Sequence, residues 1–290
     1  MLITLSPSLA SAANVISIQS VNIAPYDEAY HGLQNSCKCD IKKWILSDMK
    51  GYDVVKELRT ERPDVIIAIG SGALERIMAI KDIPIIVMMV IDINSSITGH
   101  ANITGINMDI PPDRQISIIS QAFPGVKEIG LLYNPKNRRA FVEKARASVE
   151  SRGMKLIANE VINSRKVPSR LDMMTGEIGV YWMLPDIDII TPETVEILFL
   201  YSIKNRVPVV TFSKKYLEMG AVMSLEVDSY DIGAQAADIL GQILAGKEAG
   251  NIPLGSAKKI NITINQRTAQ KLGLEIGSEI LNRAKLFNRD

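Results

Sequence analysis

Three aspartates stand where a ligand could be bound, because Asp92, Asp186 and Asp228 each end or follow an apolar stretch of the sequence. A carboxylate that has lost water in a binding site is a suitable partner for a ligand ammonium group. A single aspartate at a strand end is equally well explained as a turn former. Three such positions favour at least one contact with a ligand, and Asp228, then Asp186, are the first choices.

The segment Gly70-Ser71-Gly72 passes directly from an apolar run into a helical pattern. The free backbone N–H groups of Ser71, Gly72 and Ala73, together with the Ser71 hydroxyl, could hold a carboxylate. The alternative is that Ser71 only caps the helix, which requires the same geometry. A zwitterionic amino acid would use both kinds of site, with its carboxylate at this helix start and its amine at an aspartate.

Ligands of open parallel sheets bind beyond the carboxyl ends of the strands, so the residues after each strand complete the predicted site. Tyr26 and Tyr133 could form apolar walls of the site. Trp182 and the pair Met88-Met89 are predicted to fill the core instead. The full set of predicted contacts is Tyr26, Ser71, Gly72, Ala73, Asp92, Tyr133, Asn134, Asp186, Ser213 and Asp228.

The usual catalytic motifs are missing from the sequence. It has two histidines, His31 and His100, and lacks a Gly-x-Ser-x-Gly motif, a phosphate-binding loop and a metal-ligand cluster. We therefore predict a protein that is not an enzyme and has no cofactor or metal. Catalysis by carboxylates alone, as in glycoside hydrolysis, is the alternative.

Cys37 and Cys39 are the two cysteines of the chain. A spacing of two residues places Cα atoms roughly 6.5 Å apart on an extended strand, near the limit for an unstrained bridge. Free thiols and a strained local disulfide are both open, and neither is expected to take part in binding. His31 with the two cysteines is a weak metal signal, because the spacing is irregular.

Length and charge limit the class of partner. A chain of 290 residues with 47% hydrophobic content can bury the cores of two lobes. Its 33 basic and 32 acidic residues produce no field that would attract nucleic acid. No run reaches the ~18 uncharged apolar residues of a membrane span. Residues 1–12, which end in Ala10-Ser11-Ala12, are predicted to be the end of a signal peptide.

Strand and helix patterns alternate twice along the chain. The runs Asp64 to Ser71 and Pro84 to Asp92 are apolar on both faces, which is typical of parallel strands covered by helices. A second alternation starts at Glu128. We predict an α/β protein of two doubly wound parallel-sheet lobes with a ligand cleft and three hinge crossovers. The first lobe would comprise residues 13–105 with 229–256, and the second 106–228 with 257–290.

Several short motifs follow one another in a characteristic order. They are Ile69-Gly70-Ser71, Lys81-Asp82-Ile83-Pro84, Asn102-Ile103-Thr104-Gly105, Lys127-Glu128-Ile129-Gly130, Tyr133-Asn134-Pro135, Arg206-Val207-Pro208-Val209, Ile239 to Lys247 and Asn265 to Leu274. Their order and spacing resemble the ABC transporter substrate-binding proteins of the tryptophan and tyrosine type, which have the periplasmic binding protein type I fold.

The resemblance implies an exported, periplasmic solute-binding protein of an ABC importer that closes on a small polar ligand, such as an amino acid. Its partners would be that ligand and a transporter permease, with no nucleic acid, and the protein would be a monomer. The alternative is a sensing module of the same fold that reports ligand occupancy to a signalling partner.

Overall fold

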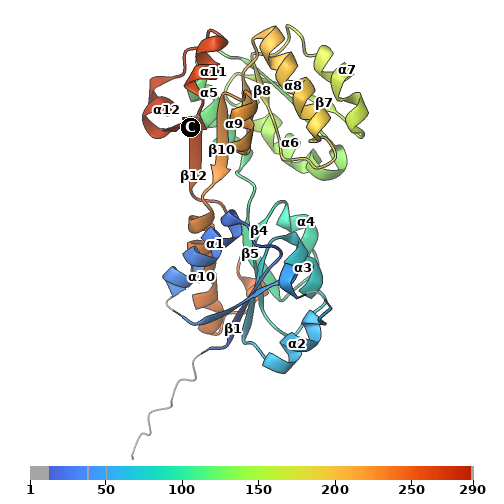
Figure 1. Ribbon diagram of the computed structural model, residues 1–290, viewed down its shortest axis with the longest axis vertical. Coiled ribbons are helices and arrows are strands. Elements are labelled where there is room, and N and C mark those ends of the chain that lie inside the picture. Colours follow the sequence, from blue (N-terminus) through green and yellow to red (C-terminus); the bar gives the residue numbers. More distant parts are fainter. Residues whose placement is uncertain (1–12, 38, 50, 289–290) are drawn as a thin grey trace, which may run out of the picture. The chain divides into compact units, whose positions relative to one another are not determined.

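The computed structural model describes residues 13–37, 39–49 and 51–288, so the predicted signal segment lies outside the described residues. The chain divides into two compact units, residues 1–109 with 227–259 and residues 110–226 with 260–290. Each unit is built around its own sheet (Figure 1). The chain passes from one unit to the other near Asp109, Val227 and Lys259, a few residues from the predicted limits.

Unit 1 contains a six-stranded sheet in the order β11-β5-β4-β3-β1-β2. The pairs whose register is defined are all parallel. Its strands are β1 (Val15–Gln19), β2 (Ile41–Ile45), β3 (Val65–Ile69), β4 (Ile85–Val90), β5 (Ile103–Asn107) and β11 (Gly255–Ser256). Its helices are α1 (Ala24–Cys37), α2 (Val54–Glu61), α3 (Ser71–Ile77), α4 (Ile93–Ile97) and α10 (Ser229–Leu244).

The apolar strands form the centre of this sheet, as their composition predicts. Every residue of β1, β3 and β4 is buried, and β-branched side chains dominate β3 and β4. Met88 and Met89 are buried on β4, which confirms that they fill the core. The edge strand β2 is different, because Lys42 is exposed and three further residues are only half-buried.

Helices α1 and α10 pack side by side in unit 1, although about 200 residues separate them in the sequence. Two glycines allow this close approach. A Cβ atom at Gly32 would lie 2.0 Å from the Tyr230 carbonyl oxygen, and one at Gly233 would lie 1.9 Å from that of Ala29. The late helix therefore returns to the first unit, as predicted.

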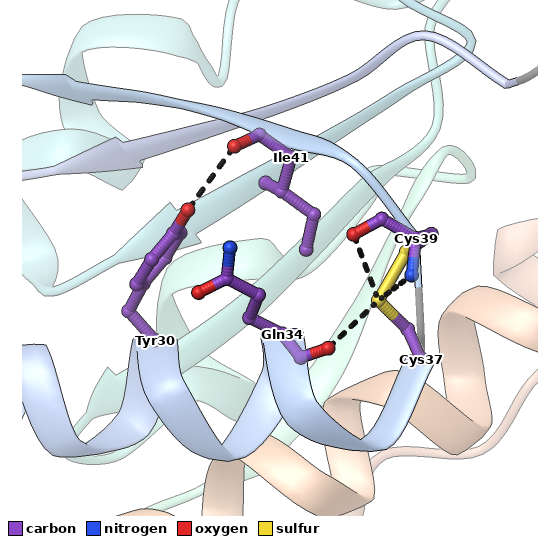
Figure 2. Close-up of a disulfide and its surroundings, with 5 residues drawn as sticks. All are labelled: Tyr30, Gln34, Cys37, Cys39 and Ile41. Atoms are coloured by element: carbon purple, nitrogen blue, oxygen red, sulfur yellow. Dashed lines mark hydrogen bonds between the residues drawn. A yellow bond between two sulfur atoms is a disulfide. The ribbon is translucent and has the colours of Figure 1, made fainter.

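A disulfide joins Cys37, the last residue of α1, to Cys39, just before β2. The two Cα atoms are 5.2 Å apart, which is within the usual range for a disulfide. Figure 2 shows this disulfide together with the hydrogen bond of 3.1 Å that Tyr30 of α1 donates to the Ile41 carbonyl of β2. Of the two alternatives left open by the sequence, the structure contains the disulfide, which joins the end of α1 to a residue just before β2.

Unit 2 contains a seven-stranded sheet in the order β13-β12-β10-β9-β8-β6-β7. Its strands are β6 (Glu128–Tyr133), β7 (Lys155–Glu160), β8 (Val180–Trp182), β9 (Val209–Thr211), β10 (Met223–Val227), β12 (Ile260–Ile264) and β13 (Lys285–Leu286). Its helices are α5 (Pro112–Ala122), α6 (Pro135–Glu150), α7 (Val167–Asp172), α8 (Pro192–Asn205), α9 (Lys215–Met219), α11 (Gln266–Lys271) and α12 (Ser278–Arg283).

Strand β12 departs from the predicted parallel arrangement of unit 2. Its two ends are bonded to opposite ends of β10, since Asp228 N–H donates to the Lys259 carbonyl and Asn265 N–H donates to that of Val222. The two strands are therefore antiparallel. The parallel core β7-β6-β8-β9-β10 is unaffected, and Trp182 on β8 is buried there, as predicted.

Helix starts in both units use the side chains that cap helices in general. Asn134 begins α6 and accepts from Lys136 N–H, with Pro135 at the first helical position. Thr191 and Thr194 form a capping box at α8. No helix within the described part of the chain is long and apolar enough to cross a membrane.

Candidate functional site

The two sheets share one topological feature that selects a candidate site in each unit. In unit 1, β1 lies between β2 and β3, and in unit 2, β6 lies between β7 and β8. From each central strand the chain goes first to the neighbouring strand on one side and then crosses to the neighbouring strand on the other side. The strand order therefore reverses between β1 and β3 in unit 1, and between β6 and β8 in unit 2. Open α/β sheets bind ligands beyond the carboxyl ends of the strands at such reversals.

The unit 1 site is built around Gly70 at the end of β3. Gly70 has a φ of 88°, a left-handed conformation that glycine adopts readily. A Cβ atom there would lie 2.6 Å from the Tyr26 hydroxyl oxygen and 2.7 Å from Ser20 Oγ. Because Gly70 has no side chain, Tyr26 and Ser20 can approach the turn between β3 and α3. The predicted contact Tyr26 therefore lies beside the predicted contacts Ser71–Ala73.

The start of α3 is capped from a neighbouring strand. Ser20 Oγ accepts a hydrogen bond of 2.8 Å from Ala73 N–H and donates one of 3.0 Å to the Ile69 carbonyl. Gly70 is the residue that precedes the helix, and Ser71 is exposed and is the first helical residue. The alternative that Ser71 caps the helix is therefore wrong, because Ser20 performs that role from 53 residues away.

Sequence reasoning missed Gln19, which is completely buried at the end of β1. Its Nε2 donates to the Val21 carbonyl at 2.9 Å and to Asp27 Oδ1 at 3.2 Å. Its Oε1 is buried and has no hydrogen-bond partner among the described residues. A polar residue that ends an otherwise apolar strand at a reversal of strand order was the signal that could have identified it.

A neighbouring charge shifts the pKa of Asp27, and burial shifts the pKa of Tyr26, both beside Gln19. The hydrogen bond of 2.6 Å from Lys43 Nζ is the main cause that lowers the pKa of Asp27. Burial raises the pKa of the Tyr26 phenol, because the phenolate would lose hydration. Tyr26 consequently stays neutral and Asp27 stays ionised at physiological pH.

Asp92 lies at the end of the strand next to this site. It is half-buried and has a φ of 51°, and Met89 on β4 has a φ of 60°. Left-handed backbone at a bulky residue costs about 1 to 3 kcal/mol, and it coincides here with a shift of register between β4 and β5. Three apolar side chains nearby in the strand-end loops are partly exposed, namely Val21, Ile23 and Ile91.

In unit 2, Asp186 is 3% exposed and occupies the centre of a hydrogen-bonded network. Its carboxylate accepts from Asn134 N–H at 2.8 Å, Asn137 Nδ2 at 3.0 Å and Asp188 N–H at 3.2 Å. Arg138, also buried, donates to the Pro185 carbonyl. Asp186 therefore joins the loop after β8 to the loop after β6, the two loops at the reversal of strand order.

The other predicted residues of unit 2 differ in their exposure. Asn134 is buried, and its Nδ2 donates to Asp188 at 2.7 Å. Tyr133 is buried at the end of β6, and its hydroxyl donates to Glu160 at 3.0 Å. Ser213 is half-buried in the loop after β9. Asn134 and Asp186 are thus brought together, whereas Ser213 follows a different strand.

Asp228 is the residue that precedes α10 in unit 1, and its side chain is 14% exposed. Its carboxylate accepts from Asp231 N–H at 3.0 Å and forms an ion pair of 3.0 Å with Lys259. The hydrogen bond from Lys259 to Asp228 also raises the pKa of that lysine. Asp228 therefore has a structural role as a helix cap, with one protein cation already beside it.

Comparison with known proteins agrees with this architecture. A tyrosine-binding protein from Clostridioides difficile (strain R20291) is 22% identical over 231 residues, which cover 77% of this chain and 66% of that protein. The ligand-free, open structure of a substrate binding protein with adhesive properties from Clostridium difficile matches with a TM-score of 0.78 and 19% identity. The alignment covers 96% of this chain and 100% of that one.

An ABC domain in complex with L-Trp from Streptococcus pneumonia matches with a TM-score of 0.67 and 23% identity, over 96% of this chain and 100% of that one. At these identities the two structures establish the fold, which is that of the periplasmic binding proteins of type I. The family model for ABC transporter substrate binding proteins matches residues 30–287, nearly the whole described sequence. The chain therefore belongs to the ABC transporter substrate binding protein family.

Proposed function

We propose that this protein binds a zwitterionic amino acid outside the cytoplasm and delivers it to the permease of an ABC importer, without chemical change to the ligand. One observation carries the proposal: both sheets place buried polar groups at their reversals of strand order, Gln19 in unit 1 and Asn134 with Asp186 in unit 2. Membership of the substrate-binding family supports the transporter partner.

An aromatic amino acid is the ligand class we favour. The relatives named above include a tyrosine-binding protein and a domain in complex with L-Trp. In this chain the partly exposed Val21, Ile23 and Ile91 would supply apolar contacts, and Tyr26 an aromatic one. The polar contacts we propose are Ser71, Gly72 and Asp92 in unit 1, and Asn134, Asp186 and Ser213 in unit 2, with Asp228 as partner of the amine. Tyr133 would be a second apolar wall. Ala73 is not among the polar contacts, because its N–H already donates to Ser20 Oγ.

Isothermal titration calorimetry with L-tryptophan and L-tyrosine tests the ligand class directly. Micromolar or tighter binding of either is the expected result, with indole and D-tryptophan at least ten times weaker. Indole lacks both the amine and the carboxylate, and D-tryptophan has them in the opposite configuration at Cα. Equal affinity for indole would mean that the zwitterionic part of the ligand is not recognised.

Asp228→Asn separates a ligand contact from a structural aspartate. Asparagine preserves the helix cap, so the fold is expected to persist. Loss of a buried charge-assisted bond would weaken binding by about 30-fold or more. The matched control is Asp53→Asn, which changes the cap of α2 in the same unit. Binding within about twofold of wild type would assign Asp228 a purely structural role and place the amine elsewhere.

Hinge closure is the proposed mechanism of capture. Three passages of the chain between the units would allow bending, and a ligand that contacts both units would favour the closed state. Solution scattering at saturating ligand should therefore give a smaller radius of gyration than the free protein. A scattering curve that does not change while calorimetry reports binding would contradict closure and leave the ligand assignment standing.

A further inference from the structure

A cavity lies within unit 2, at the opposite end of the sheet from Asn134 and Asp186. Its volume is about 870 Å³, within the range of small-molecule sites. Arg206 and Gly220, which line it, come just before β9 and β10, so the cavity is at the amino ends of these strands. The ligand site proposed above uses the carboxyl ends and does not account for it.

The lining is strongly biased towards positive charge. Among the described lining residues, Arg206, Arg267 and Lys271 contribute three cations and Glu218 contributes the single carboxylate. All three cationic residues are exposed, and none of them forms an ion pair with another described residue. Cations that are close together and unpaired repel one another, and an anion would relieve that repulsion.

Apolar side chains that face solvent form the rest of the lining. Ile203 is 63% exposed, Met219 is 48% exposed and Leu286 is 50% exposed, and they come from α8, α9 and β13. Exposed apolar side chains that gather around one cavity indicate a contact with an apolar group. The cavity therefore combines a cationic part with an apolar part.

The floor of the cavity is held in place by a buried amide. Asn265 is 9% exposed, donates from Nδ2 to the Leu217 carbonyl at 2.9 Å and accepts from Thr268 N–H at 3.0 Å. These bonds link α9 to the start of α11, the two helices that carry Glu218, Met219, Arg267 and Lys271. The backbone of this part of the lining is thus held in place.

We propose that this cavity binds an anionic amphiphile, in which a carboxylate, sulfonate or phosphate group meets Arg206, Arg267 and Lys271 and an apolar body contacts Ile203, Met219 and Leu286. Charge complementarity and the mixed lining support this class of ligand over a cationic or a purely apolar one. A free amphiphile and the head group of an anionic lipid share this chemistry. The site is independent of the amino-acid site.

Fluorescence titration with 1-anilinonaphthalene-8-sulfonate, an anionic apolar probe, tests the proposal on the whole protein. The double variant Arg267→Glu with Lys271→Glu reverses two exposed charges of the lining. The matched control, Lys127→Glu with Lys144→Glu, reverses two exposed charges of unit 2 that do not line the cavity. We expect the dissociation constant to rise about tenfold or more for the first variant and to change less than about twofold for the control.

Competition identifies the charge of the occupant and its source. Decanoate and decyl phosphate should displace the probe, whereas decyltrimethylammonium should not. Equal displacement by the cationic detergent, or an unchanged dissociation constant in the Arg267→Glu, Lys271→Glu variant, would overturn the proposal. Cosedimentation with phosphatidylglycerol vesicles would support the proposal with a lipid head group as the source, whereas displacement of the probe by monomeric decanoate without cosedimentation would support a free amphiphile.

Discussion

The loops at the carboxyl ends of the two sheets occupy the same topological position but satisfy their polar groups differently. In unit 2 the buried Asp186 has three N–H donors supplied by the protein itself. In unit 1 the buried Gln19 retains an oxygen without a partner among the described residues, beside a glycine that leaves room for Tyr26 and Ser20. A satisfied network stabilises a loop, whereas an unsatisfied buried group costs stability.

This difference suggests distinct contributions by the two units. Unit 2 would present a loop pair whose geometry is fixed before binding, and a preorganised site costs little entropy when the ligand arrives. Unit 1 would have a less stable loop, because the buried oxygen of Gln19 lacks a donor among the described residues. The following substitutions test that contrast through stability, in order of decreasing expected effect.

Asp186→Ala should have the largest effect, a loss of about 3 kcal/mol in the free energy of unfolding. The substitution removes the acceptor of the buried Asn134 N–H and of Asp188 N–H, and it leaves Asn137 Nδ2 with Asp188 as its acceptor. Urea denaturation measures the loss. The control is Asp188→Ala in the same loop, where the carboxylate is exposed and water can replace it, and about 1 kcal/mol or less is expected.

Equal losses for Asp186→Ala and Asp188→Ala would show that burial does not distinguish the two carboxylates. The hydrogen-bonded network of unit 2 would then stabilise its loops no more than an exposed turn does. This result would contradict the proposed difference between the two units.

Gly70→Ala should cost about 2 kcal/mol and also displace Tyr26 and Ser20, because the new methyl group needs space that their oxygens occupy. Gly125→Ala is a matched control. Gly125 has a φ of 89°, nearly equal to the 88° of Gly70, but no atom lies within 4 Å of a Cβ there. The control should cost about 1 kcal/mol, from the backbone alone.

Thermal or urea unfolding of both alanine variants measures this difference. If they lose the same stability, backbone conformation alone explains the glycine, and Tyr26 and Ser20 do not depend on the space above Gly70.

Alkaline pH should affect a tyrosine of unit 2 more than one of unit 1. Burial raises the pKa of Tyr181 strongly and also raises that of Tyr26. A raised folded-state pKa gives stability that is complete below the unfolded value of about 10 and is lost as pH rises towards the folded value. When the pH rises from about 9 to about 11, the free energy of unfolding of Tyr181→Phe should therefore fall by about 1 kcal/mol less than that of wild type.

Urea denaturation at these two pH values, with Tyr26→Phe as the comparison, measures the effect. Tyr26 is only half-buried, so its variant should differ less from wild type. A greater effect at Tyr26 than at Tyr181 would indicate that the unit 1 site excludes water more completely than the core of unit 2.

Local sequence was sufficient to predict most of the secondary structure that supports the sites. The apolar runs of β3 and β4 can be buried only in the middle of a covered sheet, and the α10 and β12 patterns were predicted to belong to different units, as they do. Strand β2 was missed because Lys42 and Lys43 interrupt its pattern, and an edge strand tolerates exposed side chains.

Local sequence was also sufficient to predict that Asn134, Asp186 and Asp228 stand at the ends of strands, since they follow apolar runs. It could not assign the cap of α3, which Ser20 provides from another strand. Nor could it separate Asp186, whose carboxylate accepts from three donors, from Gln19, whose Oε1 has no donor among the described residues. Composition and spacing specify how each element is formed, but hydrogen bonds between residues 50 or more positions apart depend on strand order, and strand order is decided only when the whole sheet assembles.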